Sequence, residues 1–244
     1  MENSIENNRR IWDKEYHWKD HGEEWTGQAK VCGKPYSLWK ESVVETFLKA
    51  NIGPETKVLE IGSGHGRWTS EILGLCGHIF VVDLSESCLE YCRSRFADRQ
   101  NISFLQTDGR SLKGIGDAAI DFIWSYDVFV HIDAPTIRAY FEEFHRVLRP
   151  KGRAAIHHAG RRHYALPFAF LRKIQPRGAG IYRWLSMGIS SDDDGWRSDV
   201  SRELIRGAAR QSGLAVVSQR RSWGPNREFG VPRYGDWITI LSKP

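Results

Sequence analysis

The sequence predicts an α/β fold, a doubly wound and mostly parallel sheet with helices on both faces. Between Lys57 and Ala159, five short apolar stretches alternate with stretches of helical periodicity. The first apolar stretch leads into a turn with glycines at positions 62, 64 and 66, which is typical of a strand that enters a helix beside a ligand. At 244 residues, 41% of them hydrophobic, the chain is long enough to bury the core of one such domain.

The expected elements follow in a regular order. Apolar residues at helical spacing predict helices over 37–50, 66–77, 85–98 and 134–148. Ser37 and Ser85 are expected to cap two of them, and Pro135 lies in the first turn of another. Short apolar runs predict strands over 56–62, 78–83, 101–108, 120–127 and 153–159. Downstream, 202–223 indicates a helix and a strand, and 236–243 a final strand.

Composition excludes several classes of protein. The polar N-terminus lacks the apolar region of a secretory signal, and no stretch approaches the roughly 18 apolar residues of a transmembrane helix; we therefore expect a cytoplasmic protein. The cysteines form no CxxC pair, which argues against a zinc site or a disulfide framework. Asp192 to Asp194 are consecutive in a loop and do not predict a metal site. A net charge of +5 is compatible with nucleic acid, an anionic membrane or an acidic small substrate.

The glycine-rich turn and a later carboxylate indicate a nucleoside ligand. Asp83 ends the second strand about 20 residues downstream, where a carboxylate can accept hydrogen bonds from both hydroxyls of a ribose. A dinucleotide fingerprint reads GxGxxG, whereas this turn reads GxGxG and has Arg67 at the position of the third glycine. The spacing therefore disfavours NAD.

At this point the residues carry a family resemblance. The stretch "LEIGSGHG" resembles the ExGxGxG motif of class I S-adenosylmethionine-dependent methyltransferases, and "VVDLS", "QTDG", "FIWSYDVFVHI" and "RVLRPKGRAAI" follow in the family's order. The resemblance covers roughly Lys57 to Ile156. It implies S-adenosylmethionine as cofactor and a Rossmann-like sheet of seven strands, whose last strand runs antiparallel beside the fifth.

The same resemblance implies which residues bind the cofactor. The glycines would pass beneath its methionine part, with Glu60 holding the loop or the amino group. Asp83 would bind the ribose and Leu84 would pack on the adenine. Asp108 would accept a hydrogen bond from the adenine amino group. The full expected set is Glu60, Gly62, Ser63, Gly64, Gly66, Asp83, Leu84, Asp108, Gly109, Ser125 and Tyr126.

Methyl transfer requires chiefly that nucleophile and methyl group be held in line. A hydroxyl acceptor would also use a general base, for which His131 is the first candidate because it follows the fourth strand at the carboxyl edge of the sheet. His157 and His158 end the fifth strand at the same edge. Alternation along a strand sends their side chains to opposite faces, so at most one should point into the acceptor pocket. Asp127 and Tyr126 are weaker candidates.

We therefore expect a methyltransferase for a small-molecule acceptor, most readily an oxygen of a sugar, a lipid-linked compound or a secondary metabolite. One alternative is a nucleic-acid methyltransferase. Against it, the fourth strand ends in "SYDV", where resembling base methyltransferases have an Asn/Asp-Pro-Pro-aromatic motif. Another alternative is a binding protein, or an enzyme that uses the cofactor for a different reaction, since fold does not fix function.

Two segments outside the core are expected to enclose the substrate. Residues 1–50 are rich in Trp and Tyr and predict a helical lid over the cofactor-binding domain of 51–244. A cap insertion is expected at about 160–198, after the fifth strand. From Gly160 to Ser190 this insertion carries arginine and lysine but no Asp or Glu. Two hypotheses follow, recruitment of an anionic acceptor through Arg161 and Arg162, or docking on an anionic membrane surface.

Overall fold

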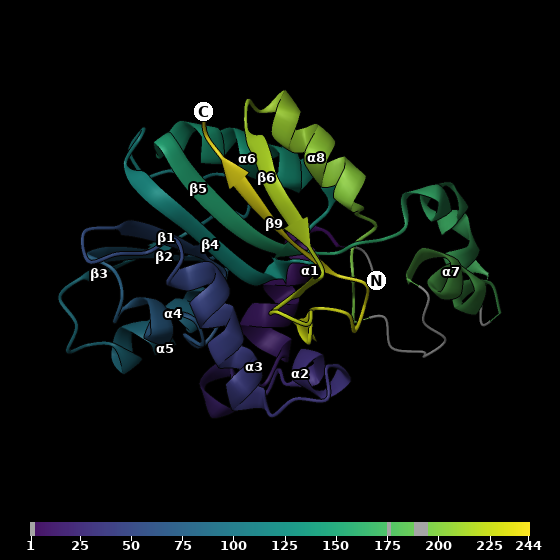
Figure 1. Cartoon of the computed structure of the whole chain (residues 1–244), viewed down its shortest axis with the longest axis horizontal. Helices are drawn as coiled ribbons and strands as arrows, with labels where there is room; N and C mark the ends of the chain where they lie inside the picture. Colours follow the sequence, from purple (N-terminus) through teal and green to yellow (C-terminus); the bar gives the residue numbers. More distant parts are fainter. Residues whose placement is uncertain (1–2, 175–176, 188–194) are drawn as a thin grey trace.

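A central sheet organises the molecule, whose computed structural model describes residues 3–174, 177–187 and 195–244. In this described part the sheet has seven strands in the order β3-β2-β1-β4-β5-β9-β6 (Figure 1). Strands β1 to β5 pair in parallel, and β9 runs antiparallel between β5 and β6. This topology confirms the predicted fold class, including the antiparallel last strand. The strands are β1 Lys57–Ile61, β2 His78–Asp83, β3 Ile102–Gln106, β4 Ile120–Phe129, β5 Leu148–His158, β6 Ala215–Arg220 and β9 Trp237–Ser242.

Helices cover both faces of the sheet. The α-helices are α1 Ile5–Arg10, α2 Gly27–Val31, α3 Tyr36–Val43, α4 Thr69–Ile72, α5 Glu86–Arg95, α6 Ala134–Val147, α7 Arg177–Met187 and α8 Arg202–Gln211. Shorter or tighter helical segments are η1 Ile11–Glu15, η2 Asp20–Gly22, η3 Val44–Leu48 and η4 His163–Lys173. A separate pair of short strands, β7 Ser222–Trp223 and β8 Phe229–Gly230, was not expected from the sequence.

Helix starts follow local capping, with one exception. Ser85 caps α5 by accepting from the Cys88 amide, and Asp133 caps α6 by accepting from the Thr136 amide. The expected cap at Ser37 is wrong, because α3 already begins at Tyr36 behind Pro35. The helix expected over 66–77 is reduced to the single turn of α4, since the glycine turn continues to Trp68.

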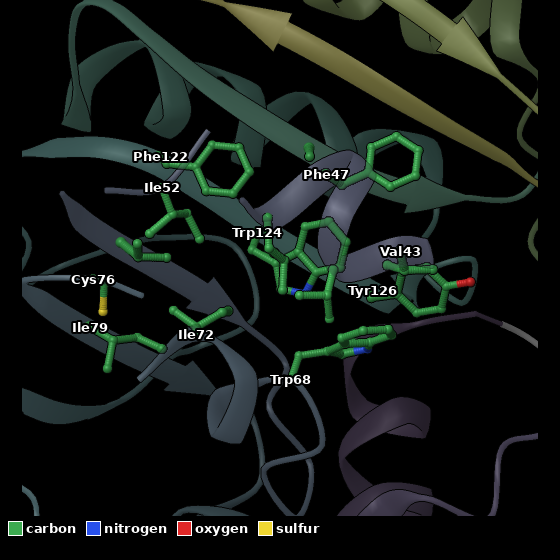
Figure 2. Close-up of a cluster of buried hydrophobic side chains, with 14 of the residues drawn as sticks. Val43, Phe47, Ile52, Trp68, Ile72, Cys76, Ile79, Phe122, Trp124 and Tyr126 are labelled. Atoms are coloured by element: carbon green, nitrogen blue, oxygen red, sulfur yellow. The ribbon is translucent and has the colours of Figure 1, made fainter. Parts of the chain in front are cut away.

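Two hydrophobic clusters sandwich the sheet. Alternation along β1 places Val58 and Glu60 on one face and Leu59 and Ile61 on the other. The first face packs against α3, η3, α4 and α5, and Figure 2 shows its aromatic side chains, among them Trp68, Trp124 and Tyr126. The second face packs against α6 and α8. Both faces are thus buried, as parallel strands require.

Figure 1 shows the cap of η4 and α7 projecting beside the sheet, whereas α1 lies near the ends of β4 and β9 and α2 lies below the sheet, next to α3. Among the described residues, no helix has both the length and the apolar character that spanning a bilayer requires.

Phe144 on α6 gives a direct test of the second cluster. Its side chain is fully buried against Phe129, Tyr140 and Phe141. Phe144→Ala should lower the free energy of unfolding by about 3–5 kcal/mol, because it leaves a cavity that these rings only partly fill. Urea denaturation measures the change. Glu142→Ala, exposed on the same helix, is the matched control and should stay within about 0.5 kcal/mol of wild type; similar losses in both variants would contradict this packing.

Candidate active site

One cavity of about 320 Å³ opens at the carboxyl end of the parallel strands, where doubly wound sheets bind ligands. Its floor is the turn after β1, with Gly62, Ser63 and Gly64. One side is formed by residues that follow β2, β3 and β4. Another is formed by segments far away in the sequence, namely 3–28, 195–197 and 233–234. A single space therefore joins the expected cofactor region to the expected acceptor region.

The glycine turn is crowded by the protein itself. Gly62 and Gly64 have φ angles of 75° and 52°, in the left-handed region that favours glycine. A Cβ on Gly62 would lie 2.2 Å from Val128 Cγ2, and one on Gly64 would lie 2.4 Å from Trp18 Cη2. At Gly66, which does not line the cavity, the same space is filled by Phe96. The three glycines therefore let side chains of this chain pack onto the turn.

Asp83 faces the cavity from the end of β2. Its Oδ2 accepts from the Gly64 amide at 3.0 Å and its Oδ1 from the Ser85 amide at 2.9 Å. Burial raises the pKa of Asp83, and the amide hydrogen bonds oppose that shift. Each carboxylate oxygen has two lone pairs, so Asp83 retains acceptor capacity toward the cavity while it holds the glycine turn.

Glu60 lies below the turn rather than in the cavity wall. It is buried and accepts from the Thr69 hydroxyl at 2.6 Å. Burial raises the pKa of Glu60 to about 8. This contact ties the end of β1 to the start of α4, so the structure places Glu60 where it can hold the turn.

The region beyond β2 and β3 is mainly apolar. Leu84, Thr107 and Gly109 line the cavity there. Asp108 does not, because its side chain is exposed and its carboxylate accepts from the amides of Arg110 and Ser111. The structure thus brings Leu84 and Gly109 together with Asp83 and leaves Asp108 in the outer turn.

The end of β4 contributes residues of two kinds. Ser125 is fully buried and donates to the Ile61 carbonyl, so it joins β4 to β1 outside the cavity. Tyr126 lines the cavity and packs on Trp68 at 5.0 Å between ring centroids. Its hydroxyl is buried without a hydrogen-bond partner. Burial and the nearby Asp127 raise the pKa of Tyr126 well above its usual range.

His131 lines the cavity as a neutral imidazole. Its Nδ1 lies 3.2 Å from the Trp196 carbonyl, and since a carbonyl only accepts, the proton resides on Nδ1 and the lone pair on Nε2. Burial, reinforced by the charge of Arg197, lowers the pKa of His131 to about 4. The ring is therefore unprotonated at neutral pH, as a general base must be.

His157 lies behind the cavity wall in a network of charges whose other members include Arg67, Asp127 and Arg197, which line the cavity. Its Nδ1 lies 3.1 Å from Asp127 Oδ1 and its Nε2 lies 3.3 Å from Asp236 Oδ2, the second an ion-pair distance rather than a hydrogen bond. The two carboxylates outweigh burial and raise the pKa of His157. Arg67 contacts Asp127 at 3.2 Å, and Arg197 contacts Asp236 at 2.8 Å. These five residues are called the charge network below.

Asp127 connects the charge network to the cavity. Its φ is 60°, an unusual left-handed value that Asp tolerates better than most residues. The pairing of β4 with β5 is irregular between Ser125 and Phe129. The carboxylate lines the cavity and its side chain keeps 30% of its surface exposed. His157 and Arg67 hold the pKa of Asp127 well below its usual range, so the group is ionised.

His158 points to the other face of β5, as alternation predicts. It is fully buried, with Nδ1 2.7 Å from the Ala159 carbonyl and Nε2 2.7 Å from Thr239 Oγ1. Burial lowers the pKa of His158 to about 4. Neither His157 nor His158 lines the cavity, so of the three expected histidines the structure brings only His131 into it.

The N-terminal segment forms part of the cavity wall. Trp12, Trp18 and Trp25 line it, and Trp18 stacks on His65, which in turn stacks on Tyr91 at 3.7 Å between ring centroids. Asp13 accepts from the hydroxyl of Ser85 at 2.7 Å. These contacts fasten residues 3–28 across the carboxyl edge of the sheet.

Sequence reasoning missed Arg197 and Asp236. Asp236 directly precedes β9, and Trp237 pairs with His158 at the end of β5. An antiparallel last strand must begin where the fifth strand ends, so the expected topology contained a signal for Asp236. The sequence contained no such signal for Arg197, because its position next to His157 and Asp236 depends on how the chain folds after the cap.

The two arginines proposed to recruit an anionic acceptor differ in their exposure. Arg161 is 2% exposed and donates to the carbonyls of Arg197 and Ser198, whereas Arg162 is exposed. Asp192 to Asp194 lie outside the described residues. Within the described ranges, His, Cys, Asp and Glu side chains form no group of three suited to a metal ion.

The charge network makes a prediction for Asp236→Asn. Removing this carboxylate leaves Arg197 and His157 buried with less counter-charge, so the free energy of unfolding should fall by about 3–5 kcal/mol. Urea denaturation at neutral pH measures it. Asp98→Asn, whose partner Arg99 forms an exposed ion pair, should cost at most about 1 kcal/mol; equal effects would show that the network adds no stability.

The pH dependence of stability, measured for wild type and for a His157→Gln variant, checks the role of His157. A raised pKa in the folded state stabilises the protein below the unfolded-state pKa of about 6.5, and this contribution disappears as the pH rises through the folded-state pKa. His157→Gln should therefore flatten the alkaline decline in stability relative to wild type. An unchanged decline would assign it to other groups.

Comparisons with known proteins agree with this geometry. Residues 58–152 match a family model described as a methyltransferase domain. The demethylmenaquinone methyltransferase of Staphylococcus epidermidis is 27% identical over 125 residues, 50% of this chain and 49% of the relative. The glycine/sarcosine/dimethylglycine N-methyltransferase of Actinopolyspora halophila is 36% identical over 112 residues, 43% of this chain and 19% of the relative.

The chain thus spans about half the length, or less, of these curated relatives. An S-adenosylmethionine-dependent methyltransferase of known structure from Mesorhizobium loti shares the fold, with a TM-score of 0.58 and 15% identity over 84% of this chain and 97% of that chain. Residues 58–152 match the methyltransferase domain, and the glycine turn and the strand order agree with those of the class I S-adenosylmethionine-dependent methyltransferases that the chain resembles.

Proposed function

We propose that this protein transfers a methyl group from S-adenosylmethionine to a small-molecule acceptor, with an oxygen atom as the site of methylation. The observation that carries the proposal is the shared cavity. Asp83 and the glycine turn line one end of it, and the neutral His131 lines it together with Asp127. A cofactor site and a base within one enclosed space are what a hydroxyl methyltransferase needs.

The residues at the turn fit the cofactor. Asp83 retains acceptor capacity for ribose hydroxyls, Leu84 and Gly109 provide an apolar surface for adenine, and the unpartnered hydroxyl of Tyr126 is a free donor at the other end. When bound, the cofactor supplies an electrophilic methyl group on a sulfonium. The chain's own part is to orient that group and exclude water. We propose that the N-terminal segment of residues 1–50 acts as the lid, through Trp12, Trp18 and Trp25.

His131 is proposed to take the proton from the acceptor. The carbonyl of Trp196 fixes the proton on Nδ1 and leaves the Nε2 lone pair available. The Asn8 side chain donates to the His131 carbonyl at 2.9 Å, which helps to fix the backbone at this position.

An amine acceptor is the second candidate. Asp127 offers an ionised, partly exposed carboxylate, and the rings of Trp12, Trp25 and Trp196 surround the same cavity. Aromatic faces and a carboxylate together suit an ammonium group. A relative named as an N-methyltransferase of glycine and its methylated derivatives supports this alternative.

Incubation of the protein with methyl-labelled S-adenosylmethionine and separate pools of hydroxyl and amine compounds tests the proposal. Label in a hydroxyl compound supports oxygen as the acceptor atom, and label in an amine supports the second candidate. Label in neither pool, together with no calorimetric binding of S-adenosylhomocysteine, would overturn both.

The cofactor site predicts the effect of Asp83→Ala. Loss of charge-assisted hydrogen bonds to the ribose should weaken binding of S-adenosylhomocysteine by about 1.5–3 kcal/mol, as measured by isothermal calorimetry. Asp108→Ala is the matched control, because this aspartate lies outside the cavity and should leave the affinity unchanged. The reverse pattern would move the carboxylate contact from Asp83 to Asp108.

The base role predicts that His131→Ala lowers kcat by about 100-fold or more and leaves the affinity for S-adenosylhomocysteine unchanged. Because the pKa of His131 is lowered to about 4, its neutral form persists down to that pH, and the acid limb of kcat/KM should lie near 4. His158→Asn, which changes a histidine outside the cavity, serves as control. An acid limb near 6.5 in wild type, or normal turnover without His131, would exclude it as the base.

A further inference from the structure

The cap displays an apolar surface that the rest of the described protein does not match. Of the ten large apolar side chains that are exposed, six lie on η4, on α7 or between them. One of them, Trp184, is 60% exposed. These six are called the cap patch, namely Tyr164, Phe168, Phe170, Ile174, Ile181 and Trp184.

The opposite side of the cap is anchored to the body, which fixes the direction of the cap patch. Tyr182 is fully buried, and its hydroxyl donates to Asp199 Oδ1 at 2.9 Å. The buried guanidinium of Arg161 lies 5.6 Å from the Tyr182 ring and donates to the Arg197 carbonyl at 2.8 Å. The cap patch residues are therefore exposed side chains of an element that packs on the body through other residues, and Figure 1 shows α7 projecting beside the sheet.

The charge of the same segment selects the partner. Between Gly160 and Ser190 the chain contains Arg161, Arg162, Arg172, Lys173, Arg177 and Arg183 but no Asp or Glu. The exposed Arg162 donates to the hydroxyl of Tyr164, so a cation and the cap patch are adjacent. Exposed aromatic rings beside cations suit the interface of an anionic bilayer, where the rings enter the headgroup region and the cations meet lipid phosphates.

A second copy of this chain is a poorer occupant. Two caps that met face to face would bring two stretches of like charge together, and such juxtaposition opposes association. An anionic lipid surface has the opposite sign and accepts the apolar rings.

We propose that the cap docks this protein on an anionic membrane surface through the cap patch and the adjacent exposed Arg162. The cap joins the cavity wall directly, since Arg161 holds the backbone of Arg197 and Trp196 lines the cavity while remaining partly exposed. Docking would thus place the cavity near the lipid headgroups. The proposal does not depend on the methyl acceptor.

Sedimentation with phosphatidylcholine vesicles, with and without phosphatidylglycerol, tests the proposal on the whole protein. Wild type should bind the vesicles that contain phosphatidylglycerol and lose binding as salt rises. Phe168→Ser/Phe170→Ser/Trp184→Ser should weaken that binding by at least about tenfold. Arg162→Glu should weaken it severalfold, since one basic residue near such a surface contributes about 1 kcal/mol.

Val31→Ser/Leu38→Ser is the matched control, because it removes exposed apolar side chains on α2 and α3, outside the cap, and should bind as wild type does. Circular dichroism and S-adenosylhomocysteine affinity identify any variant that fails to fold, in which case the three serine substitutions are tested singly. Wild type that ignores phosphatidylglycerol, or a triple variant that binds as well as wild type, would overturn the proposal. The proposal would also be overturned if the triple variant differed from wild type only in sedimenting as a monomer instead of a dimer.

Discussion

The charge network around His157 is the constraint on which the candidate site depends. It joins residues from the turn after β1, the end of β4, the end of β5, the segment after the cap and the residue before β9. Burying these charges costs several kcal/mol per ion unless each meets its partner in good geometry. The network therefore forms only when all five segments are in register, and it then holds one wall of the cavity rigidly.

This rigidity explains the unequal roles of neighbouring residues. Asp127 reaches the cavity because its left-handed backbone turns it out of the regular strand, a conformation that persists only where surrounding contacts support it. His157 lies on β5, which β4 separates from β1, and it stays behind the wall as a positioning group. His131, held by the Trp196 carbonyl instead of by charge, remains neutral. One edge of the sheet thus presents an ionised carboxylate and a neutral imidazole to the same space.

The cavity is completed by chain that lies outside the methyltransferase domain in sequence. Trp18 fills the space above Gly64, and the aromatic stack through His65 to Tyr91 joins the N-terminal segment to α5. Arg67 joins the glycine turn to the same N-terminal segment, since its Nη2 donates to the Trp25 carbonyl at 3.4 Å, and its Nε donates to the Tyr36 hydroxyl on α3 at 2.9 Å. The turn at which we propose that the cofactor binds is therefore also the surface on which the N-terminal segment, the proposed lid, is seated.

The features visible from the sequence were those with local causes. Short apolar runs predicted the strands, and Ser85 and the glycines marked positions with specific backbone needs. The order of these segments predicted a parallel, doubly wound sheet, and the family resemblance added the antiparallel last strand. The sequence placed Asp108 and Ser125 at the correct edge of the sheet but did not determine where their side chains point. A shift of one position along the chain decides whether a side chain faces the cavity or lies in the turn. The partners of Asp127 lie from 30 to 70 positions away in the sequence, at separations for which no local pattern exists. Only the packed sheet brings Asp236 and Arg197 to His157, because buried charges select their partners by three-dimensional proximity.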